Sequence, residues 1–378
     1  MLTHYLLGLP LWWLLPALGL ALAVDRWWGE PPLRWHPVVW MGNYLGWAGR
    51  HLQALARPWP LSAPSPLQPE RVHGGGAEGR AWQPPSGADW RAFWAGALAW
   101  WLGVAWALAG ALALMQAVSQ GMSALQGSAA AQGVAVLLLG LALKPLLAWA
   151  MLRSEVSAVE QALSGSLEAG RERLSWLVSR DVSALSESGV RESALESLAE
   201  NLSDSVVAPL FWFVLLGLPG AAVYRLANTA DAMWGYRGVY RGKTWEWAGK
   251  WAARADDVLN WIPARVTAVA LCWAAPARPG AAARPRWSQL AQEAARTPSP
   301  NSGWPMAALA LSLGLALRKP GVYVLNAAGQ APAAAATLQA VALCRRALVW
   351  TVAAMAAAVL AVAATPALVA GAPWGAVA

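Results

Sequence analysis

Long apolar stretches alternate with polar ones along this chain. Four apolar stretches reach the roughly 20 residues that a helix needs to cross a bilayer, and they cover 5–24, 93–118, 134–152 and 347–370. This pattern predicts an all-α, polytopic integral membrane protein with at least four transmembrane helices, connected by helical loops on the cytoplasmic side.

Two shorter apolar stretches, 206–224 and 258–275, are interrupted by helix breakers or polar residues. The first contains Pro219–Gly220. Two interpretations stay open: a pair of spans with a short excursion between them, or re-entrant or buried helices. Broken helices at membrane depth are tolerated where they line a protein cavity, so both interpretations leave room for a site. A third stretch, 305–317, is too short to assign.

Composition supports the membrane class, and charge orients the chain. Of the 378 residues, 57% are hydrophobic and 13% are charged, against about 25% charged in ordinary soluble proteins. The formal net charge is +8, and basic residues lie between apolar stretches. That distribution marks cytoplasmic loops and does not indicate a nucleic-acid partner. The positive-inside rule predicts that 25–91 and 153–346 are cytoplasmic and that both termini lie outside.

Two further segments and the two cysteines add to this predicted architecture. Residues 1–24 lack a basic start and a convincing cleavage site, so we expect a retained first helix and not a signal peptide. The Pro-, Gly- and Ser-rich segment 58–89 predicts a flexible cytoplasmic insertion in a single membrane-embedded domain that covers 1–378. Cys272 and Cys344 lie far apart, so neither a disulfide framework nor a zinc site is predicted.

A ladder of carboxylates leads into the 206–224 stretch. Its members, four residues apart, are Glu192, Glu196, Glu200 and Asp204. On a helix this spacing drifts by about 40° per step and gives a slowly winding acidic stripe. On an ordinary soluble helix such a stripe is usually a solvated face. Here no basic residue follows Arg191 within the stripe, and unpaired acids beside a membrane segment are costly and usually functional. Oxygen-rich clusters of this kind suit Mg²⁺.

Other polar clusters flank the ladder in the sequence. They supply Asp25, His36, Arg180, Asp181, Asn228, Asp231, Arg254, Asp256, Asp257, Asn260, Arg265 and Asn301. The neighbours Asp256 and Asp257 point to different helix faces, so we expect one to serve a site and the other to cap a helix or pair with an arginine. Arg265, inside an apolar stretch, needs an acidic partner or an anionic substrate. No Walker A loop, GxSxG, HExxH or paired CxxC motif is present, so any nucleotide site would be of an unfamiliar kind.

The clusters fall within six stretches that occur in a fixed order. They are DRWWGEPPLRWHPVVWMG, SRDVS, LESLAENLSDSVVAPLFW, LPGAAVYRLANTADAMWGY, ARADDVLNWIPARVTA and PNSGWP. Together they resemble the integral-membrane adenosylcobinamide-phosphate synthases, the CobD/CbiB family of cobalamin biosynthesis. The departures from the family pattern are small and fall at Val182, Ser205, Ala230 and Ala255. Glu192 does not belong to the pattern, so we expect it to face solvent or pair with an arginine.

The resemblance implies a ligase that joins a propionate of adenosylcobyric acid to (R)-1-amino-2-propanol O-phosphate, or to the free amino alcohol, with ATP as co-substrate and Mg²⁺ as cofactor. The catalytic residues that it implies are Glu196, Glu200, Asn201, Asp204, Asp256 and Asp257, with Glu200 and Asp204 as Mg²⁺ ligands. The substrate-binding residues that it implies are Asp25, His36, Arg180, Asp181, Asn228, Asp231, Arg254, Asn260, Arg265 and Asn301.

The resemblance also implies a multi-pass protein of the cell inner membrane whose active site faces the cytoplasm. Its expected partners are the corrinoid and amino alcohol phosphate substrates, the lipid bilayer and other membrane-bound enzymes of cobalamin assembly. Two other classes of protein compete with this interpretation. A non-enzymatic membrane sensor of the AmpE type would not need the near-complete polar set. A transporter would favour inverted repeats and more long spans than four.

Overall fold

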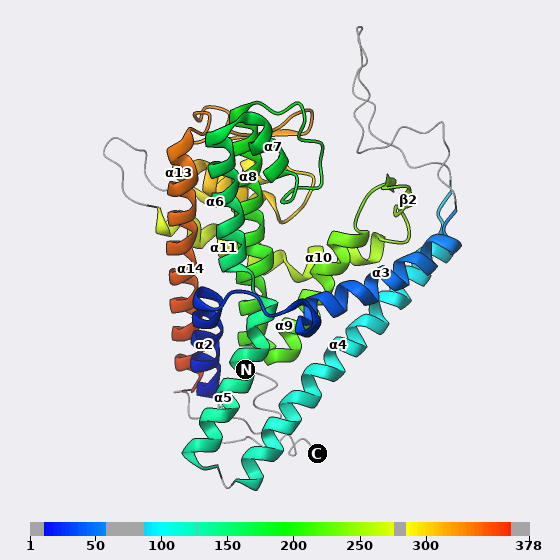
Figure 1. The fold of residues 1–378 in the computed structure, drawn as a ribbon, viewed down its shortest axis with the longest axis vertical. Coiled ribbons are helices and arrows are strands. Elements are labelled where there is room, and N and C mark those ends of the chain that lie inside the picture. Colours follow the sequence, from blue (N-terminus) through cyan, green and yellow to red (C-terminus); the bar gives the residue numbers. More distant parts are fainter. Residues whose placement is uncertain (1–10, 58–86, 126, 276–284, 364–378) are drawn as a thin grey trace, which may run out of the picture. The chain divides into compact units, whose positions relative to one another are not determined.

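The computed structural model describes residues 11–57, 87–125, 127–275 and 285–363. Within these ranges the chain is largely helical, and its strands form two short antiparallel hairpins (Figure 1). The predicted all-α class is confirmed. The predicted insertion at 58–89 lies outside the described residues except for its last three.

The chain divides into two compact units. The first comprises 1–30, 111–221 and 260–378, and the second comprises 31–110 and 222–259. Two long helices, α4 (Trp90–Ala124) and α9 (Ala208–Trp234), contribute residues to both units. The single domain expected over the whole chain stays a prediction.

The first unit contains most of the helices. Its elements in chain order are η1 (Leu11–Trp13), α2 (Leu14–Trp27), α5 (Ala129–Leu143), η3 (Lys144–Leu146), α6 (Trp149–Gly165), α7 (Leu167–Leu174), α8 (Glu187–Leu202), η4 (Ser203–Val207), α11 (Trp261–Ala274), α12 (Trp287–Ala294), α13 (Gly303–Leu313), β3 (Leu317–Lys319), β4 (Tyr323–Leu325) and α14 (Ala334–Ala363). The second unit adds η2 (Leu33–Trp35), α3 (Pro37–Leu55), β1 (Val239–Tyr240), β2 (Lys243–Thr244) and α10 (Lys250–Leu259).

Four helical runs of the described chain are long and apolar enough to cross a membrane. They are Trp90–Ala124, Ala129–Gly165, Glu187–Trp234 and Ala334–Ala363. Three of them contain most of the predicted spans at 93–118, 134–152 and 347–370, so the polytopic membrane class is confirmed. The runs extend beyond the apolar windows because alanine, glutamate and arginine are good helix formers and continue the helix after the hydropathy falls.

The fourth run differs from the expectation. The predicted span at 5–24 lies partly outside the described residues, and its described part forms η1 and the 14-residue α2. The long run is instead Glu187–Trp234, which takes in the 206–224 stretch. Its break falls at Gly217 (φ 68°, ψ −161°) and not at the predicted Pro219–Gly220, because those angles are accessible almost only to glycine.

The two other weak apolar stretches form short helices. The 258–275 stretch becomes the end of α10 and the 14-residue α11, and the 305–317 stretch becomes most of α13 together with the start of β3. Both α11 and α13 are apolar but shorter than a span.

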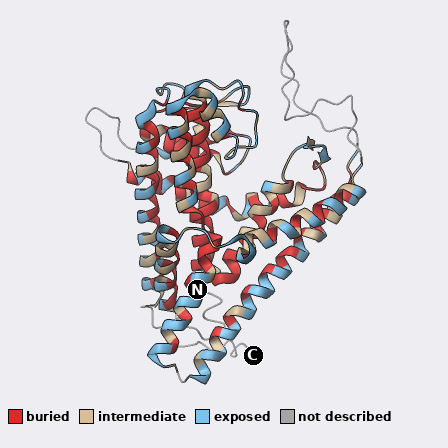
Figure 2. Cartoon of the chain, in the orientation of Figure 1, coloured by how far each residue is buried: buried red, intermediate tan, exposed pale blue. Residues whose placement is uncertain are grey.

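The centre of the first unit is α8. It packs against α6, α7, α13, α14 and β3, and Figure 2 shows it as a largely buried helix. Residues 191–199 are buried without interruption, so the acidic stripe is not a solvated face. A helix enclosed on all sides must find a partner for each polar side chain, and those partners define the site.

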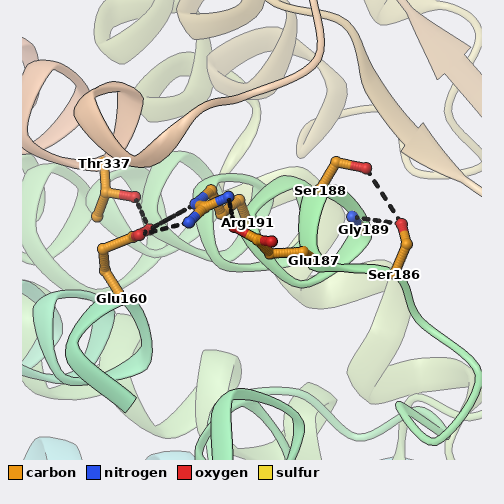
Figure 3. A network of polar contacts seen from close by, with 7 residues as sticks. All are labelled: Glu160, Ser186, Glu187, Ser188, Gly189, Arg191 and Thr337. Atoms are coloured by element: carbon orange, nitrogen blue, oxygen red, sulfur yellow. Dashed lines mark hydrogen bonds and ion pairs between the residues drawn. The ribbon is translucent and has the colours of Figure 1, made fainter. Parts of the chain in front are cut away.

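One such set of partners joins three helices of this unit. Arg191 on α8 donates from Nε and Nη2 to the Glu160 carboxylate on α6, at 2.8–3.0 Å. Thr337 Oγ1 on α14 donates to Glu160 Oε2 at 2.8 Å, and Figure 3 shows these side chains converging. Ser186 caps the N-terminus of α8, and its hydroxyl accepts a hydrogen bond from the Gly189 amide. This network fixes the position of α8 in the bundle.

Candidate functional site

A polar cavity of about 190 Å³ lies against the second half of α8. Its lining comes from the loop before α8, from α8 itself and from the β3–β4 hairpin, and consists of Leu177, Val178, Ser179, Arg180, Ser193, Glu196, Ser197, Glu200, Asn201, Lys319 and Tyr323. Four residues that the sequence predicted for a site, namely Arg180, Glu196, Glu200 and Asn201, are therefore brought together.

An incompletely satisfied ion pair lies at the centre of the cavity. Arg180 Nη2 donates to Glu196 Oε2 at 3.0 Å and also to Ser193 Oγ. Glu196 is only 5% exposed. The other atom of each group, Arg180 Nη1 and Glu196 Oε1, is buried and has no hydrogen-bond partner within the described part of the chain. A buried polar atom without a partner costs free energy, so these two atoms suit a ligand.

The hairpin supplies two residues that the sequence analysis missed. Lys319 and Tyr323 are directly paired across β3 and β4, so both side chains lie on the same face of the hairpin. Lys319 and Arg180 both attract the Glu196 and Glu200 carboxylates electrostatically. Burial, together with the negative charge of Glu196 and Glu200, holds the pKa of Tyr323 well above its usual range, so its hydroxyl stays protonated at neutral pH.

A sequence signal for this hairpin exists. The segment LRKPGVYVL places a Pro-Gly turn between two short runs rich in β-branched or large residues, which is a hairpin pattern. The turn sets Lys319 opposite Tyr323. The segment adjoins an apolar stretch too short to assign, so the hydropathy pattern did not indicate a site there.

Near the end of the ladder, Asn201 and Asp204 make contacts outside the carboxylate stripe. Asp204 lies in η4, a π-helical turn, and accepts a hydrogen bond from Asn260 Nδ2 on the α10–α11 junction. Asn201 Nδ2 donates to Ser197 O at 3.0 Å, and Asn201 Oδ1 accepts from Ser205 Oγ at 3.3 Å. Asp204 and Asn260 do not line the cavity. Single-turn π-helices occur often at functional sites.

The first rung of the ladder is buried and paired with an arginine. Glu192 is 3% exposed, and it accepts hydrogen bonds from Arg318 N and Nη1, both at 2.8 Å. The expectation that Glu192 faces solvent is wrong, because α8 is enclosed. The alternative expectation, that it pairs with an arginine, is confirmed.

Arg265 and Asn301 form a separate cluster in the first unit. Arg265 Nη1 donates to Asn301 Oδ1 at 3.1 Å and to Trp261 O at 2.7 Å. Its guanidinium lies 4.1 Å and 4.7 Å from the ring centres of Trp261 and Trp304. The expected acidic partner is not found among the described residues: carbonyl and amide oxygens and two indole faces stabilise the charge instead.

Asp25 and Asp181 have structural contacts in the first unit. Asp25 is 1% exposed, lies 3.5 Å from Lys144 Nζ, and accepts from the Ala150 amide at 2.8 Å. It thereby fixes the start of α6 next to α2. Asp181 is exposed and accepts from the Ser183 amide at 2.9 Å, and that bond lowers its pKa below the ordinary value. Neither residue lines the cavity.

The remaining predicted residues belong to the second unit. They are His36, which precedes α3, Asn228 and Asp231 on α9, and Arg254, Asp256 and Asp257 on α10. Asn228 Nδ2 lies 3.4 Å from Asp256 Oδ1. Burial raises the pKa of Asp257, although Arg237 and Arg254 attract its carboxylate. Asp256 is buried and Asp257 is half-buried.

No group of three or more metal-ligating side chains occurs in the described part of the chain. A closed, protein-held metal site is therefore not indicated there. A Mg²⁺ ion that arrives with nucleotide phosphates needs only one or two carboxylates; Glu200 lines the cavity, whereas Asp204 lies outside it and accepts a hydrogen bond from Asn260. Their role as metal ligands stays a prediction.

Comparison with known proteins shows the family. The model of the CobD/Cbib protein family matches residues 18–351. The chain is 34% identical over 338 residues to the cobalamin biosynthesis protein CobD of Brucella suis, covering 85% of this chain and 90% of that protein. It is 37% identical over 303 residues to the namesake protein of Chromobacterium violaceum, covering 79% and 80%. A third relative, from Rhodobacter capsulatus, is 40% identical over 222 residues, or 56% of this chain and 68% of that protein.

No solved structure matches the chain. The family match extends from within α2 into α14 and thus includes the loop, the helix and the hairpin that form the cavity. The chain belongs to the CobD/Cbib protein family.

Proposed function

We propose that this protein is a membrane-bound ligase of cobalamin biosynthesis that forms an amide between a corrinoid carboxylate and an amino alcohol phosphate at the expense of ATP. Membership of the CobD/Cbib family supports the pathway. The observation that carries the chemistry is the cavity on α8, where two carboxylates, an arginine and a lysine converge.

The reaction has three physical demands. A carboxylate is a poor acyl donor, so one of its oxygens must first be made a leaving group. In the route proposed here, that oxygen attacks the γ-phosphorus of ATP and displaces ADP, which gives an acyl phosphate. The amine nitrogen then attacks the acyl carbon, the C–N bond forms, the C–O bond breaks and inorganic phosphate leaves. An ammonium cannot attack, so a base must take its proton.

The residues in the cavity match these demands in type. The phosphate of the amine substrate needs cationic ligands, and Arg180 and Lys319 supply positive charge in the cavity. Glu196 and Glu200 are carboxylates that can accept a proton from the ammonium. Glu200 is the better base, because Glu196 is already paired with Arg180. Mg²⁺, when bound with ATP, would neutralise phosphate charge, and Asp204 would be its protein ligand, since Glu200 serves as the base.

The proposal extends to the setting of the enzyme. We propose that the protein lies in the cell inner membrane, that the cavity faces the cytoplasm, where ATP is available, and that other membrane-bound enzymes of cobalamin assembly are its partners. The basic residues of 153–346 support this orientation.

The decisive test is product formation by purified protein in lipid nanodiscs. We expect ATP consumption only when cobyric acid and the amino alcohol phosphate are both present, with the amide product detected by mass spectrometry. Glu200→Gln should lower kcat by at least about 100-fold, the usual range for loss of a general base, while membrane insertion stays intact. Wild-type activity in Glu200→Gln would contradict the assignment of the base, and ATP turnover without both substrates would contradict the reaction.

A further inference from the structure

The cavity on α8 carries unused charge of both signs. In the ion pair, Arg180 Nη2 donates to Glu196 Oε2. The other two atoms, Arg180 Nη1 and Glu196 Oε1, are buried without a hydrogen-bond partner among the described residues. Lys319 and Glu200 line the same cavity, and neither has a hydrogen bond or a salt bridge from its side chain to any described residue. Two cationic groups, Arg180 and Lys319, therefore lie in one small space with the carboxylates of Glu196 and Glu200.

The cavity has room for a small ligand and does not enclose the whole of a large one. Its volume of about 190 Å³ is below the roughly 300–1,000 Å³ of pockets that enclose drug-sized molecules. A corrin ring or a whole nucleotide exceeds this space, whereas a molecule of fewer than about ten non-hydrogen atoms, each taking less room than the ~30 Å³ of a liquid water, fits within it. Of the proposed substrates, only the amino alcohol phosphate has this size.

The charges also match that molecule. An aminoalkyl phosphate is a zwitterion with an ammonium at one end and a phosphate at the other. Arginine and lysine are the usual phosphate ligands of proteins, and paired carboxylates are the natural partners of an ammonium. The small hydroxyls of Ser193 and Ser197 and the phenol of Tyr323 add neutral hydrogen-bonding groups along the same wall.

We propose that this cavity is the subsite for the amine substrate, and that Lys319 on the β3–β4 hairpin is the residue that selects the phosphorylated form. Lys319 and Arg180 Nη1 hold the phosphate, and Glu200 and Glu196 Oε1 hold the ammonium. Tyr323, opposite Lys319 on the hairpin, also lines the cavity and borders the ligand. This assignment rests on the proposed amide ligation and adds to it the place and the selectivity of the amine.

The main test compares two amine substrates, the amino alcohol phosphate and the free amino alcohol, in steady-state kinetics. Lys319→Met should raise KM for the phosphorylated amine by about 10- to 100-fold, the equivalent of one charge-assisted hydrogen bond. KM for the free amino alcohol and for the corrinoid should change less than about threefold. Lys319→Arg keeps the charge and should recover most of the loss, which separates recognition from folding.

A matched control uses the other hairpin. Lys243 on β2 is exposed, so Lys243→Met removes the same charge from the same kind of element and should leave every KM unchanged. If Lys319→Met raises KM for the corrinoid or for ATP instead of the amine, or affects both amines equally, the assignment of the phosphate contact is overturned.

A binding measurement without ATP keeps this test independent of turnover. Calorimetry should show the wild-type protein binding the amino alcohol phosphate more tightly than either propyl phosphate or 1-amino-2-propanol. Lys319→Met should reduce the advantage over 1-amino-2-propanol by about 10-fold or more, and Glu200→Gln should reduce the advantage over propyl phosphate by a similar factor. Equal affinity of the wild type for all three compounds overturns the subsite. Charge-selective binding without any amide product would support the subsite and contradict the ligase function. Amide synthesis that does not depend on Lys319 would support the ligase function and contradict the subsite.

Discussion

At the scale of single residues, the three glutamates of α8 differ by what they contact and not by their type. Glu192 has two hydrogen bonds from Arg318. Glu196 has one oxygen bonded to Arg180 and one without a partner among the described residues. Glu200 faces the cavity. A carboxylate that is fully bonded supports structure, whereas one that is incompletely bonded is available to a ligand.

The asymmetry of the Glu192–Arg318 pair gives a stability prediction. Glu192 is 3% exposed at its side chain and Arg318 is 43% exposed. Arg318→Met leaves a buried carboxylate without its ion-pair partner and should cost about 2–4 kcal/mol. Glu192→Gln leaves an arginine that water can still solvate and should cost about 1–2 kcal/mol. Thermal unfolding in detergent should therefore rank wild type above Glu192→Gln, and Glu192→Gln above Arg318→Met.

Glu187 offers the control for this ranking. Its side chain is 60% exposed although it pairs with Arg191, so Glu187→Gln should change stability by no more than about 0.5 kcal/mol. The reverse order, with Glu192→Gln the less stable of the two variants, would mean that Arg318 and not Glu192 is the costlier group to leave unpaired.

At the scale of elements, the break in α9 depends on one glycine. Gly217 has φ 68° and ψ −161°, a conformation that costs other residues about 1–3 kcal/mol. Gly217→Ala should lower stability by this amount and lower the yield of folded protein. Gly133 lies within α5 with open space around it, so Gly133→Ala should be neutral or slightly stabilising. Equal melting temperatures for the two variants would show that the break tolerates a side chain.

The sequence predicted the elements that depend on local chemistry better than those that depend on packing. Long apolar runs sufficed for the class of fold, the acidic spacing indicated Glu196 and Glu200, and the family resemblance added Arg180; the structure brings these three residues to one cavity. The hairpin residues Lys319 and Tyr323 were missed, because short strands carry weak periodicity and their place beside α8 is a long-range contact. Glu192 was partly misjudged for the same reason: Arg318 lies 126 positions away in the sequence.

At the scale of the whole molecule, the predicted orientation sets both ends of one span on opposite sides of the membrane. Ser123, near the end of α4, and Ser164, near the end of α6, are both exposed, and each hydroxyl donates to a backbone carbonyl of its own helix. Ser123 precedes the run Ala129–Gly165, and Ser164 is its second-last residue. The positive-inside rule places Ser164 in the cytoplasm and Ser123 outside.

Labelling of single cysteines tests this orientation. In sealed right-side-out vesicles, a membrane-impermeant maleimide should label Ser123→Cys and not Ser164→Cys, and inverted vesicles should give the opposite result. The native Cys272 and Cys344 are buried, so the background from them should be low. Labelling of both variants from the same side would contradict the span, and a reversed pattern would contradict the orientation.

The π-helical turn at Ser203–Val207 has a consequence for how the ladder is compared between proteins. The wider turn shifts the rotational phase of everything that follows it, so Asp204 is not the next step of the stripe that Glu196 and Glu200 begin. An ordinary helical wheel would place all three on one winding stripe, at steps of about 40°. Winding these residues as an α-helix at unchanged length would turn α9 relative to α8 by most of one residue's ~100° step, whereas an α-helix one residue shorter would keep the present phase. The length of this short segment is therefore as much a part of the site as the identity of its acids.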